Sequence, residues 1–327
     1  MTLDLTDRKL LNLIQSDFPL CREPFAALGA ILEVDEGDVM SRMQRLKDER
    51  FVRSISAVFN ASGLGYHSTL VAMHLDGERV ERAAELINRN PGVSHNYLRD
   101  NYLNLWFTLT VTKDTDLEVA VAELGKSAEA ELALSLPTRQ SFKINVCFDM
   151  LSQDKTLGNG EEVLFGPREG DEVTEGEVAV VRQLQRDLPL ESRPFDTMAA
   201  NLGISPDEFL HKAVSFQERG VMRRYGARLD HYKSGFVANA LSCWKVEPDR
   251  VQDVGKTLAS HPSVSHCYER HTAPQWQYNI YAMIHGHSPE EPQSIAHHLS
   301  GETGVTDYLL LPSTKEYLKR RMQYFQG

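Results

Sequence analysis

The chain has 327 residues, of which 41% are hydrophobic and 25% charged, and its formal net charge is −11 at pH 7. This is the composition of a globular protein with a core, and the acidic balance argues against broad nucleic-acid affinity, which requires clustered Lys and Arg. There is no run of about 18 apolar residues, so no membrane span is expected. The cysteines are scattered without a Cys-x-x-Cys pair and the polar N-terminus is no signal peptide, so neither zinc nor disulfides are indicated and a cytoplasmic location is expected.

The first sixty residues have the pattern of a winged helix-turn-helix. Apolar positions at helical spacing predict helices at 5–17, 24–32 and 35–50, and the alternation that follows predicts a strand at 51–58. Three short helices followed by a strand are typical of this motif. We therefore assign residues 1–60 to a winged helix-turn-helix domain.

The following segment alternates strands and helices. Strands are predicted at 66–75, 93–97, 104–112 and 140–147, and helices at 78–89 and 116–127. The order βαββαβ is that of a ferredoxin-like sandwich, which we assign to residues 61–151. Residues 152–172 are rich in Gly and acidic side chains, so they are predicted to form a solvated, flexible linker.

The second half of the chain repeats the first. Asp17–Phe25 is matched by Asp187–Phe195 at an offset of 170, and Leu136–Phe142 by Leu311–Tyr317 at an offset of 175. The expected fold class is therefore α+β, a tandem duplication of a winged helix-turn-helix (1–60 and 173–231) plus a ferredoxin-like βαββαβ domain (61–151 and 232–327). A site in such a chain is expected to be built twice or shared across a pseudo-twofold interface. The elements predicted in the repeat are helices at 174–186, 194–202, 206–219, 250–260 and 290–300, and strands at 221–229, 236–246, 263–268, 278–285 and 315–320.

The third helix of each helix-turn-helix lacks the charge of a DNA reader. Residues 36–50 carry four basic and four acidic side chains, and residues 206–219 carry two basic against three acidic. A helix that reads the major groove presents Arg, Lys, Asn or Gln on a face that attracts phosphate. We therefore expect these helices to be a scaffold without a DNA role.

Each unit carries a His-x-Tyr-x-Arg string on a predicted strand that enters a loop. Alternate residues of a strand share one face, so each string presents an imidazole, a phenol and a guanidinium together. Guanidinium binds carboxylate through two parallel hydrogen bonds, and imidazole can donate a proton near neutral pH. The alternative is that each string forms a polar sheet face under a loop or at a dimer interface. Three residues without a function would, however, be expected to diverge in sequence after the duplication. The two strings are His95, Tyr97, Arg99 and His266, Tyr268, Arg270.

The loops and wings supply further candidates. Trp106, Trp276 and Tyr278 are candidate stacking walls for a flat aromatic ligand, although Trp106 fits a strand core equally well. His231 ends the second wing and is either a solvated loop residue or an axial metal ligand in one copy only. Four other histidines match no strong ligand spacing and are expected at the surface. They are His285, His287, His297 and His298.

Four segments resemble a known family. They are Arg53–Phe59, Ser94–Phe107, Arg223–His231 and His266–Gly286, and they look like the siroheme decarboxylases. The helix-turn-helix followed by βαββαβ is similar to the Lrp/AsnC regulators, so both ferredoxin-like domains are expected to be of the AsnC type. In the family two related subunits usually pair, whereas here they look fused head to tail. The resemblance implies removal of carbon dioxide from two acetates of siroheme to give 12,18-didecarboxysiroheme, in heme d1 or alternative heme biosynthesis.

Siroheme is flat, carries iron and has eight carboxylates, so its site needs an aromatic slot and guanidinium clamps, and an axial His would suit the iron. His95 and His266 are the predicted proton donors. Tyr97 and Tyr268 would orient them or the leaving carboxylate. His231 is the candidate axial ligand to the substrate iron. No cofactor is expected beyond that iron, because the pyrroles can accept the electrons that carbon dioxide leaves behind. The predicted substrate-binding residues are Arg53, Arg99, Asn101, Trp106, Arg223, Arg224, Arg270, Trp276, Tyr278 and Asn279.

Two other functions remain open at this stage. One is an Lrp/AsnC-type transcriptional regulator, which would need the cationic recognition helix that the sequence lacks. The other is a non-catalytic heme-binding protein, which would share the pocket but not the turnover. The expected partner is siroheme, with no nucleic acid and no membrane. A homodimer, or pairing with other heme-pathway decarboxylase subunits, stays open, and so does the copy that holds the working pocket, because Glu269 and His271 flank Arg270 where more basic or Pro character is expected.

Overall fold

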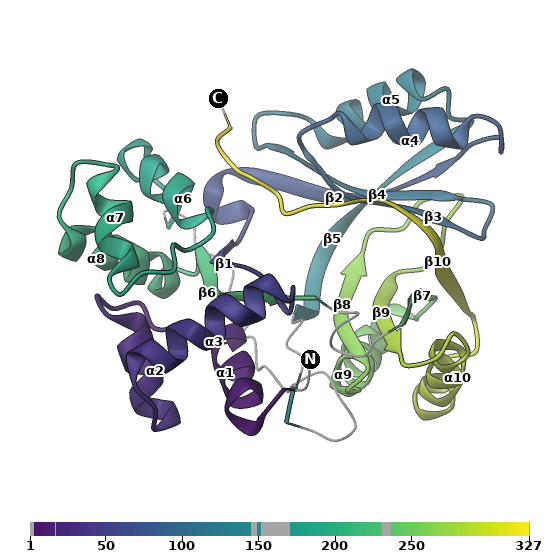
Figure 1. The fold of residues 1–327 in the computed structure, drawn as a ribbon. Coiled ribbons are helices and arrows are strands. Elements are labelled where there is room, and N and C mark those ends of the chain that lie inside the picture. Colours follow the sequence, from purple (N-terminus) through teal and green to yellow (C-terminus); the bar gives the residue numbers. More distant parts are fainter. Residues whose placement is uncertain (1–2, 17, 145–148, 152–170, 231–236, 327) are drawn as a thin grey trace.

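The computed structural model describes residues 3–16, 18–144, 149–151, 171–230 and 237–326. Figure 1 shows a helical lobe, formed by both helix-turn-helix units, beside a strand-rich lobe. The predicted fold class, a duplicated winged helix-turn-helix plus ferredoxin-like domain, is confirmed. Among the described residues, no helix has the length and apolar character needed to cross a bilayer. The linker predicted at 152–172 falls, except for its last two residues, outside the described part of the chain.

The helical lobe is built from two matching sets of three helices and a wing. Asp35 caps α3 by accepting from the Asp38 amide, and Ser205 caps α8 by accepting from the Glu208 amide, so the same local signal starts both third helices. Pro24 and Pro194 occupy the first turn of α2 and α7, where a missing N–H costs nothing. The elements are α1 Leu5–Ser16, α2 Pro24–Leu32, α3 Glu36–Asp48, β1 Val52–Phe59, α6 Val178–Leu184, α7 Pro194–Ala200, α8 Pro206–Glu218 and β6 Met222–Leu229.

The two wings pair with each other. β1 and β6 form an antiparallel two-stranded sheet in which Ser56 lies opposite Gly226. A Cβ at Gly226 would lie 2.8 Å from the Gln15 carbonyl oxygen, so the missing side chain lets α1 approach β6. Both units bury their apolar residues in one shared core, which extends from Phe25 to Phe195. The duplication therefore satisfies a pseudo-twofold interface within one chain.

The strands of the two ferredoxin-like domains close into one barrel. Its order is β10-β3-β4-β2-β5-β8-β9-β7, with β7 returning to β10. The long strands β5 and β10 each leave their own sheet and pair with the other unit, β5 with β8 and β10 with β3. The strands are β2 Tyr66–His74, β3 Val93–Arg99, β4 Leu105–Thr112, β5 Leu132–Ile144, β7 Ala238–Trp244, β8 Val264–Arg270, β9 Ile280–Gly286 and β10 Tyr308–Lys319.

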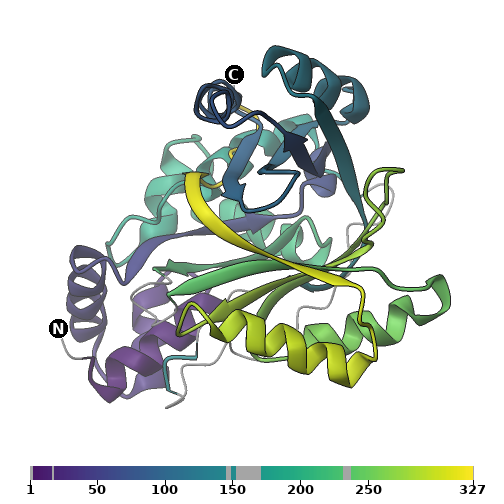
Figure 2. The same cartoon turned by 90° about the vertical axis from the view of Figure 1, so that its right-hand side faces the viewer.

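Helices cover the outer faces of the barrel. α4 Val80–Asn88 and α5 Leu117–Ser127 cover the first sheet (Figure 1). α9 Val251–Ser260 and α10 Glu291–Thr303 lie side by side against the second (Figure 2). The inner faces meet in an apolar cluster that includes Leu136 and Leu311 and fills one part of the interior. Polar residues are thereby left to line the rest of the interior.

Two strands begin earlier than the sequence predicts. The strand predicted at 140–147 starts at Leu132, and the strand predicted at 315–320 starts at Tyr308, while residues 145–148 lie outside the described residues. Each contains a proline, Pro137 or Pro312, which ordinarily argues against a strand. Here each proline lies where its strand leaves one partner and begins to pair with the next, so the missing N–H breaks neither ladder.

Candidate active site

A cavity of about 1910 Å³ lies between the interior of the barrel and the paired wings. Its walls come from both units: strands β2 to β5 and β7 to β9, the wings β1 and β6, the last residue of β10, Lys319, and the segment 320–324 that follows it. Pockets for small ligands usually measure about 300–1,000 Å³. This cavity is therefore sized for a large ligand, and one bound molecule can contact both repeats.

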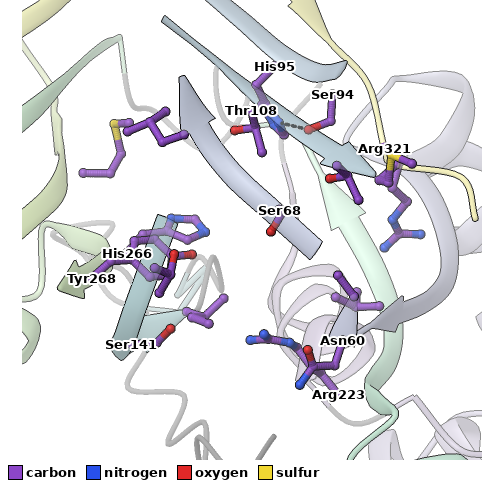
Figure 3. Close-up of a pocket in the computed structure, with 18 of the residues that line it drawn as sticks. Asn60, Ser68, Ser94, His95, Thr108, Ser141, Arg223, His266, Tyr268 and Arg321 are labelled. Atoms are coloured by element: carbon purple, nitrogen blue, oxygen red, sulfur yellow. Dashed lines mark hydrogen bonds between the residues drawn. The ribbon is translucent and has the colours of Figure 1, made fainter. Parts of the chain in front are cut away.

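Both His-x-Tyr-x-Arg strings line this single cavity, from β3 and from β8. The intervening residues turn away: Asn96 bonds the Asn88 side chain of α4, and Leu98 packs in the core beneath that helix. The shared face expected from strand alternation is thus present in both copies. Figure 3 shows His95 and His266 on opposite walls with open space between them. The two copies consequently form one site rather than two separate ones.

The two arginines of the strings lie deepest. Arg99 is 4% exposed and donates from Nη1 to the Leu311 carbonyl at 2.6 Å, and Arg270 donates from Nη1 to the Leu136 carbonyl at 3.0 Å. Burial lowers the pKa of Arg99 to about 10, so it remains a cation at neutral pH. The Nε atoms of both arginines are buried without a hydrogen-bond partner among the described residues. Donors buried in this way call for a ligand that accepts from them.

The two histidines are held by the serines that precede them. Ser94 Oγ lies 2.9 Å from His95 Nδ1, and Ser265 Oγ lies 2.9 Å from His266 Nδ1, which leaves Nε2 as the nitrogen available to a ligand. Burial, reinforced by nearby cations such as Arg228 for His95, lowers the pKa of both imidazoles to about 4. Both rings are therefore neutral at pH 7 in the ligand-free protein.

The tyrosines complete each string. The ring centroids of His95 and Tyr97 are 6.4 Å apart, and those of His266 and Tyr268 are 6.1 Å apart. The next residue of each string, an arginine, lies 5.4 Å from the Tyr97 ring in the first copy and 4.9 Å from the Tyr268 ring in the second. Each phenol is thus fixed between an imidazole and a guanidinium, so it is placed to contact whatever those groups bind.

The wings and the C-terminal segment make the cavity strongly cationic. Among its described lining residues, eleven Lys and Arg side chains face two acidic ones, in a chain whose net charge is −11. Three of these arginines form ion pairs with carboxylates outside the lining, Arg53 with Asp230, Arg139 with Glu269 and Arg219 with Glu177. Low-dielectric walls of one charge sign concentrate ions of the opposite sign. The cavity therefore selects a polyanion. The cationic residues are Arg53, Arg99, Arg139, Arg219, Arg223, Arg224, Arg228, Arg270, Lys319, Arg320 and Arg321.

Part of this charge was missed by the sequence prediction. Arg53, Arg223 and Arg224 line the cavity as predicted, but Arg228 and Arg321 were not singled out. Burial and then the neighbouring Arg228 lower the pKa of Arg321 to about 10. Arg228 Nε and Arg321 Nη1 are buried without hydrogen-bond partners in the described structure. The signal was present in the wing alternation, which places Arg228 on the face of Arg224, and in the basic run at 319–321.

Several predicted binding residues are not among those that line the cavity. Trp276 is 6% exposed, and its Nε1 donates to the Tyr281 hydroxyl at 2.8 Å, so it fills the barrel interior instead of walling a ligand. Tyr278 donates its hydroxyl to Asp307 Oδ1 at 3.2 Å. The aromatic loop serves the barrel core, because the inner strand faces leave an apolar space there.

Two predicted asparagines also have structural roles. The Asn279 side chain bonds both the N–H and the C=O of Val246 at 2.9 Å, and the Asn101 side chain accepts from the Leu103 amide at 3.2 Å. Each satisfies loop backbone that water cannot reach fully. Trp106 does line the cavity, although it is 1% exposed and mostly core. His231 lies outside the described residues, so its assignment as an axial ligand stays a prediction.

One histidine assigned to the surface lies in the cavity wall. His285 is half-buried on β9, lines the cavity, and places Nε2 2.7 Å from Ser265 Oγ. His287, His297 and His298 are exposed, as expected. His285 was misplaced because it stands two residues before an exposed histidine, and strand alternation alone does not tell which face a barrel turns inward.

The charges of the third helices are satisfied within the lobe. Arg42 bonds Asp4, Asp7 and Asp38, and the carboxylate hydrogen bonds raise its pKa. Lys47 lies 2.9 Å from Asp187. The wings β1 and β6 are paired with each other. Arg42, Arg45 and Lys47 of α3 are thus ion-paired within the lobe, and the scaffold role expected for the third helices stays a prediction.

Comparison with known proteins agrees with this geometry. Residues 7–53 and 177–223 match the family described as the siroheme decarboxylase NirDL-like HTH domain, and residues 63–143 and 233–318 match the AsnC-like ligand binding domain. The chain is 38% identical over 319 residues to the siroheme decarboxylase of Hydrogenobacter thermophilus, covering 97% of this chain and 94% of that protein. The chain belongs to the siroheme decarboxylase family.

Members of this family resemble the chain in two ways. The crystal structure of the siroheme decarboxylase NirDL in co-complex with an iron-uroporphyrin III analogue superposes with a TM-score of 0.78 at 34% identity, over 98% of this chain and 95% of that chain. The siroheme decarboxylase beta subunit of Methanosarcina barkeri is 36% identical over 143 residues, which is 44% of this chain and 94% of that subunit. One repeat of this chain thus corresponds to one whole subunit of that relative.

Proposed function

We propose that the protein is a carboxy-lyase that removes carbon dioxide from two acetate side chains of siroheme to give 12,18-didecarboxysiroheme, for heme d1 or alternative heme biosynthesis. The observation that carries this proposal is the cavity lined by eleven Lys and Arg side chains, into which both His-x-Tyr-x-Arg strings point. Membership of the siroheme decarboxylase family supports it. The substrate's eight carboxylates would complement these cations, among which Arg99 Nε and Arg270 Nε are buried without a hydrogen-bond partner in the described structure.

Binding would rest on the guanidinium groups. Arg99 and Arg270 at the floor, and Arg53, Arg223 and Arg224 from the wings, would each grip a carboxylate through two parallel hydrogen bonds. Buried like charges repel one another, so filling the cavity with carboxylates removes a cost that the empty site carries. His231 remains the proposed axial ligand to the substrate iron. We propose no further cofactor.

His95 and His266 would supply the protons. When an acetate loses carbon dioxide, the carbon–carbon bond electrons pass into the pyrrole, and the new methyl carbon must gain one proton. Nε2 of each imidazole is positioned for this donation because Nδ1 is held by serine. Substrate carboxylates would raise both histidine pKa values from about 4, since a nearby negative charge favours the protonated ring. Tyr97 and Tyr268 would orient the imidazole or the departing carboxylate.

Because both strings share one cavity, one bound tetrapyrrole can meet two imidazoles on opposite walls. This supports both copies being part of the working pocket. We also propose that the chain supplies by itself the pair of subunits that some relatives form from two chains, since β5 with β8 and β10 with β3 already join the repeats. Pairing with further subunits is not required by this arrangement.

Anaerobic incubation with siroheme, followed by mass spectrometry of the tetrapyrrole, tests the proposal. Loss of first one and then two carbon dioxide units is expected. If siroheme binds but its mass never changes, the protein is a carrier and not a decarboxylase. If siroheme does not bind, the cationic cavity has been assigned to the wrong polyanion.

A further inference from the structure

A second imidazole stands behind His266. Ser265 is fully buried, and its Oγ lies 2.9 Å from His266 Nδ1 and 2.7 Å from His285 Nε2. We propose that His285 is a positioning and proton-relay residue that resupplies His266 through Ser265, and that this relay exists only in the second half of the site. The inference rests on the proposed function, because it assigns a role within the same reaction.

The hydrogen-bond chemistry of the trio fixes its possible states. A serine hydroxyl has one proton to donate, so between two ring nitrogens Ser265 donates to one and accepts from the other. In one state it donates to His266 Nδ1 and accepts from His285 Nε2–H, which leaves His266 with its proton on Nε2, toward the cavity. In the other state both bonds reverse, and Nε2 of His266 is then a base. The trio can therefore switch His266 between donor and acceptor without moving a heavy atom.

The proton balance of one decarboxylation fits this switch. His266 gives its Nε2 proton to the methyl carbon that forms as carbon dioxide leaves. The Ser265 proton passes to His266 Nδ1, and Ser265 takes one from Nε2 of a protonated His285. His285 ends neutral, and one proton has been consumed, as replacement of a carboxylate by hydrogen requires. To reset the trio, Nε2 of His266 takes one proton from the cavity side. The Nδ1 proton of His266 then returns to Ser265, and the Ser265 proton returns to Nε2 of His285, which is protonated again.

Among the described residues of the first half of the site, the imidazole bonded to Ser94 is His95 alone, and His67, which also lines the cavity, is exposed on β2. Trp106 lies opposite Tyr97 in the β3–β4 ladder, and Tyr281 lies opposite Tyr268 in the β8–β9 ladder. Counting four residues onward from Trp106 and Tyr281, Thr110 occupies the position of His285. Thr110 also lines the cavity, but its hydroxyl has no second ring nitrogen to store a proton. The two walls are therefore chemically unequal, although the rest of each string is repeated.

The position of His285 depends on the strand ladder and not on the relay. Its backbone N–H donates to the Ser263 carbonyl at 2.9 Å, and Asn239 of β7 lies opposite it in register. A side-chain substitution therefore leaves the β8–β9 contact in place. Gln keeps an amide that can still bond Ser265, but it cannot store and release a proton.

The test is His285→Gln in the full chain, with His287→Gln as the matched control on an exposed residue two positions along. We expect His285→Gln to bind siroheme with unchanged affinity in a spectral titration, to lose at least tenfold in kcat for one of the two decarboxylations, and to accumulate the singly decarboxylated product. The His287→Gln protein is expected to behave as wild type. Equal kcat and equal product distribution in His285→Gln and wild type would overturn the relay.

Two further measurements keep the result decisive. In His285→Ala, added imidazole is expected to restore turnover, measured against wild type and Ser265→Ala with the same imidazole because imidazole also binds iron. If the variants do not fold, a proton inventory on the wild-type protein replaces them: a curved dependence of kcat on deuterium fraction supports the relay, and a linear one overturns it. A wild-type protein that releases no carbon dioxide from siroheme refutes the proposed function itself, which separates the two failures.

Discussion

Arg99 and Arg270 are equivalent residues of the two repeats, and each donates Nη1 to a leucine carbonyl of the other unit. The acceptors, Leu311 and Leu136, both precede the proline at which a long strand changes partner. The strands that change partner therefore hold Arg99 and Arg270 in place and also join the two repeats. The floor of the cavity is therefore formed by contacts between the two repeats, and the arginines expected to bind the ligand are part of those contacts.

Substituting both floor arginines is expected to abolish tight tetrapyrrole binding. A hydrogen bond to a charged group contributes about 1.5–3 kcal/mol, so Arg99→Ala with Arg270→Ala should weaken siroheme affinity by at least 100-fold. Spectral titration measures this, with Arg82→Ala on the exposed face of α4 as the control. Circular dichroism at the same concentration separates lost binding from lost folding. Unchanged affinity in a folded double variant would remove these residues from the binding site.

Removing the imidazoles one at a time is expected to spare binding and slow chemistry. His95→Ala and His266→Ala should each bind siroheme but decarboxylate at least tenfold more slowly, because general acid catalysis contributes about 10²–10⁴-fold. Single-turnover kinetics under anaerobic conditions measure the rate, and His298→Ala, on an exposed face of α10, is the control. If His266→Ala turns over like wild type, His266 is not the proton donor.

The sequence predicts much of this architecture because its local signals are repeated. The caps of α3 and α8 and the prolines that open α2 and α7 are all short-range features, so they can be read directly. The strand exchange cannot be read in this way, because the partner of β5 is chosen more than a hundred residues later along the chain. Pro137 and Pro312 therefore look like strand ends when they mark a change of partner.

The sequence predicts those parts of the site that depend only on the alternation of side chains along a strand. His95, Tyr97 and Arg99 share a face in any strand, but which loop aromatics reach that face depends on barrel closure. Trp276 was predicted to wall a ligand because a loop tryptophan beside a proline looks exposed, whereas its side chain is buried and donates to the Tyr281 hydroxyl. The contact between Ser265 and His285 was not predicted, because their spacing in the sequence does not show that β8 and β9 pair in this register.

The buried histidines should make stability depend on pH. The pKa values of His95 and His266 are about 4 in the fold against an ordinary value of 6.5. Between those values the unfolded chain binds protons at these rings and the folded chain does not. The free energy of unfolding therefore falls as pH drops from 6.5 toward 4, by roughly 1–3 kcal/mol per histidine.

Denaturant unfolding of the ligand-free protein at pH 7 and pH 5 measures this effect. The double variant His95→Gln, His266→Gln is expected to show a smaller loss between the two pH values than wild type. Substituting the exposed pair, His297→Gln with His298→Gln, should leave the wild-type loss in place. If the first double variant loses as much stability as wild type, the two cavity histidines titrate normally in the fold.

The crowded guanidinium groups are expected to lower the stability of the ligand-free protein and to raise its affinity for siroheme. Burial and the nearby Arg228 lower the pKa of Arg321 to about 10, which means that its charged form is disfavoured in the empty cavity. Arg321→Met keeps the length of the side chain and removes the charge. Removing this charge relieves its desolvation and its repulsion by Arg228, so the ligand-free variant should unfold at higher denaturant concentration than wild type. Its siroheme affinity should fall by roughly tenfold, the loss of one charged hydrogen bond.

Arg82→Met, on the solvent face of α4, is the control and should change neither quantity. A variant that loses both stability and affinity would show instead that Arg321 stabilises the fold and is not there mainly to bind the ligand.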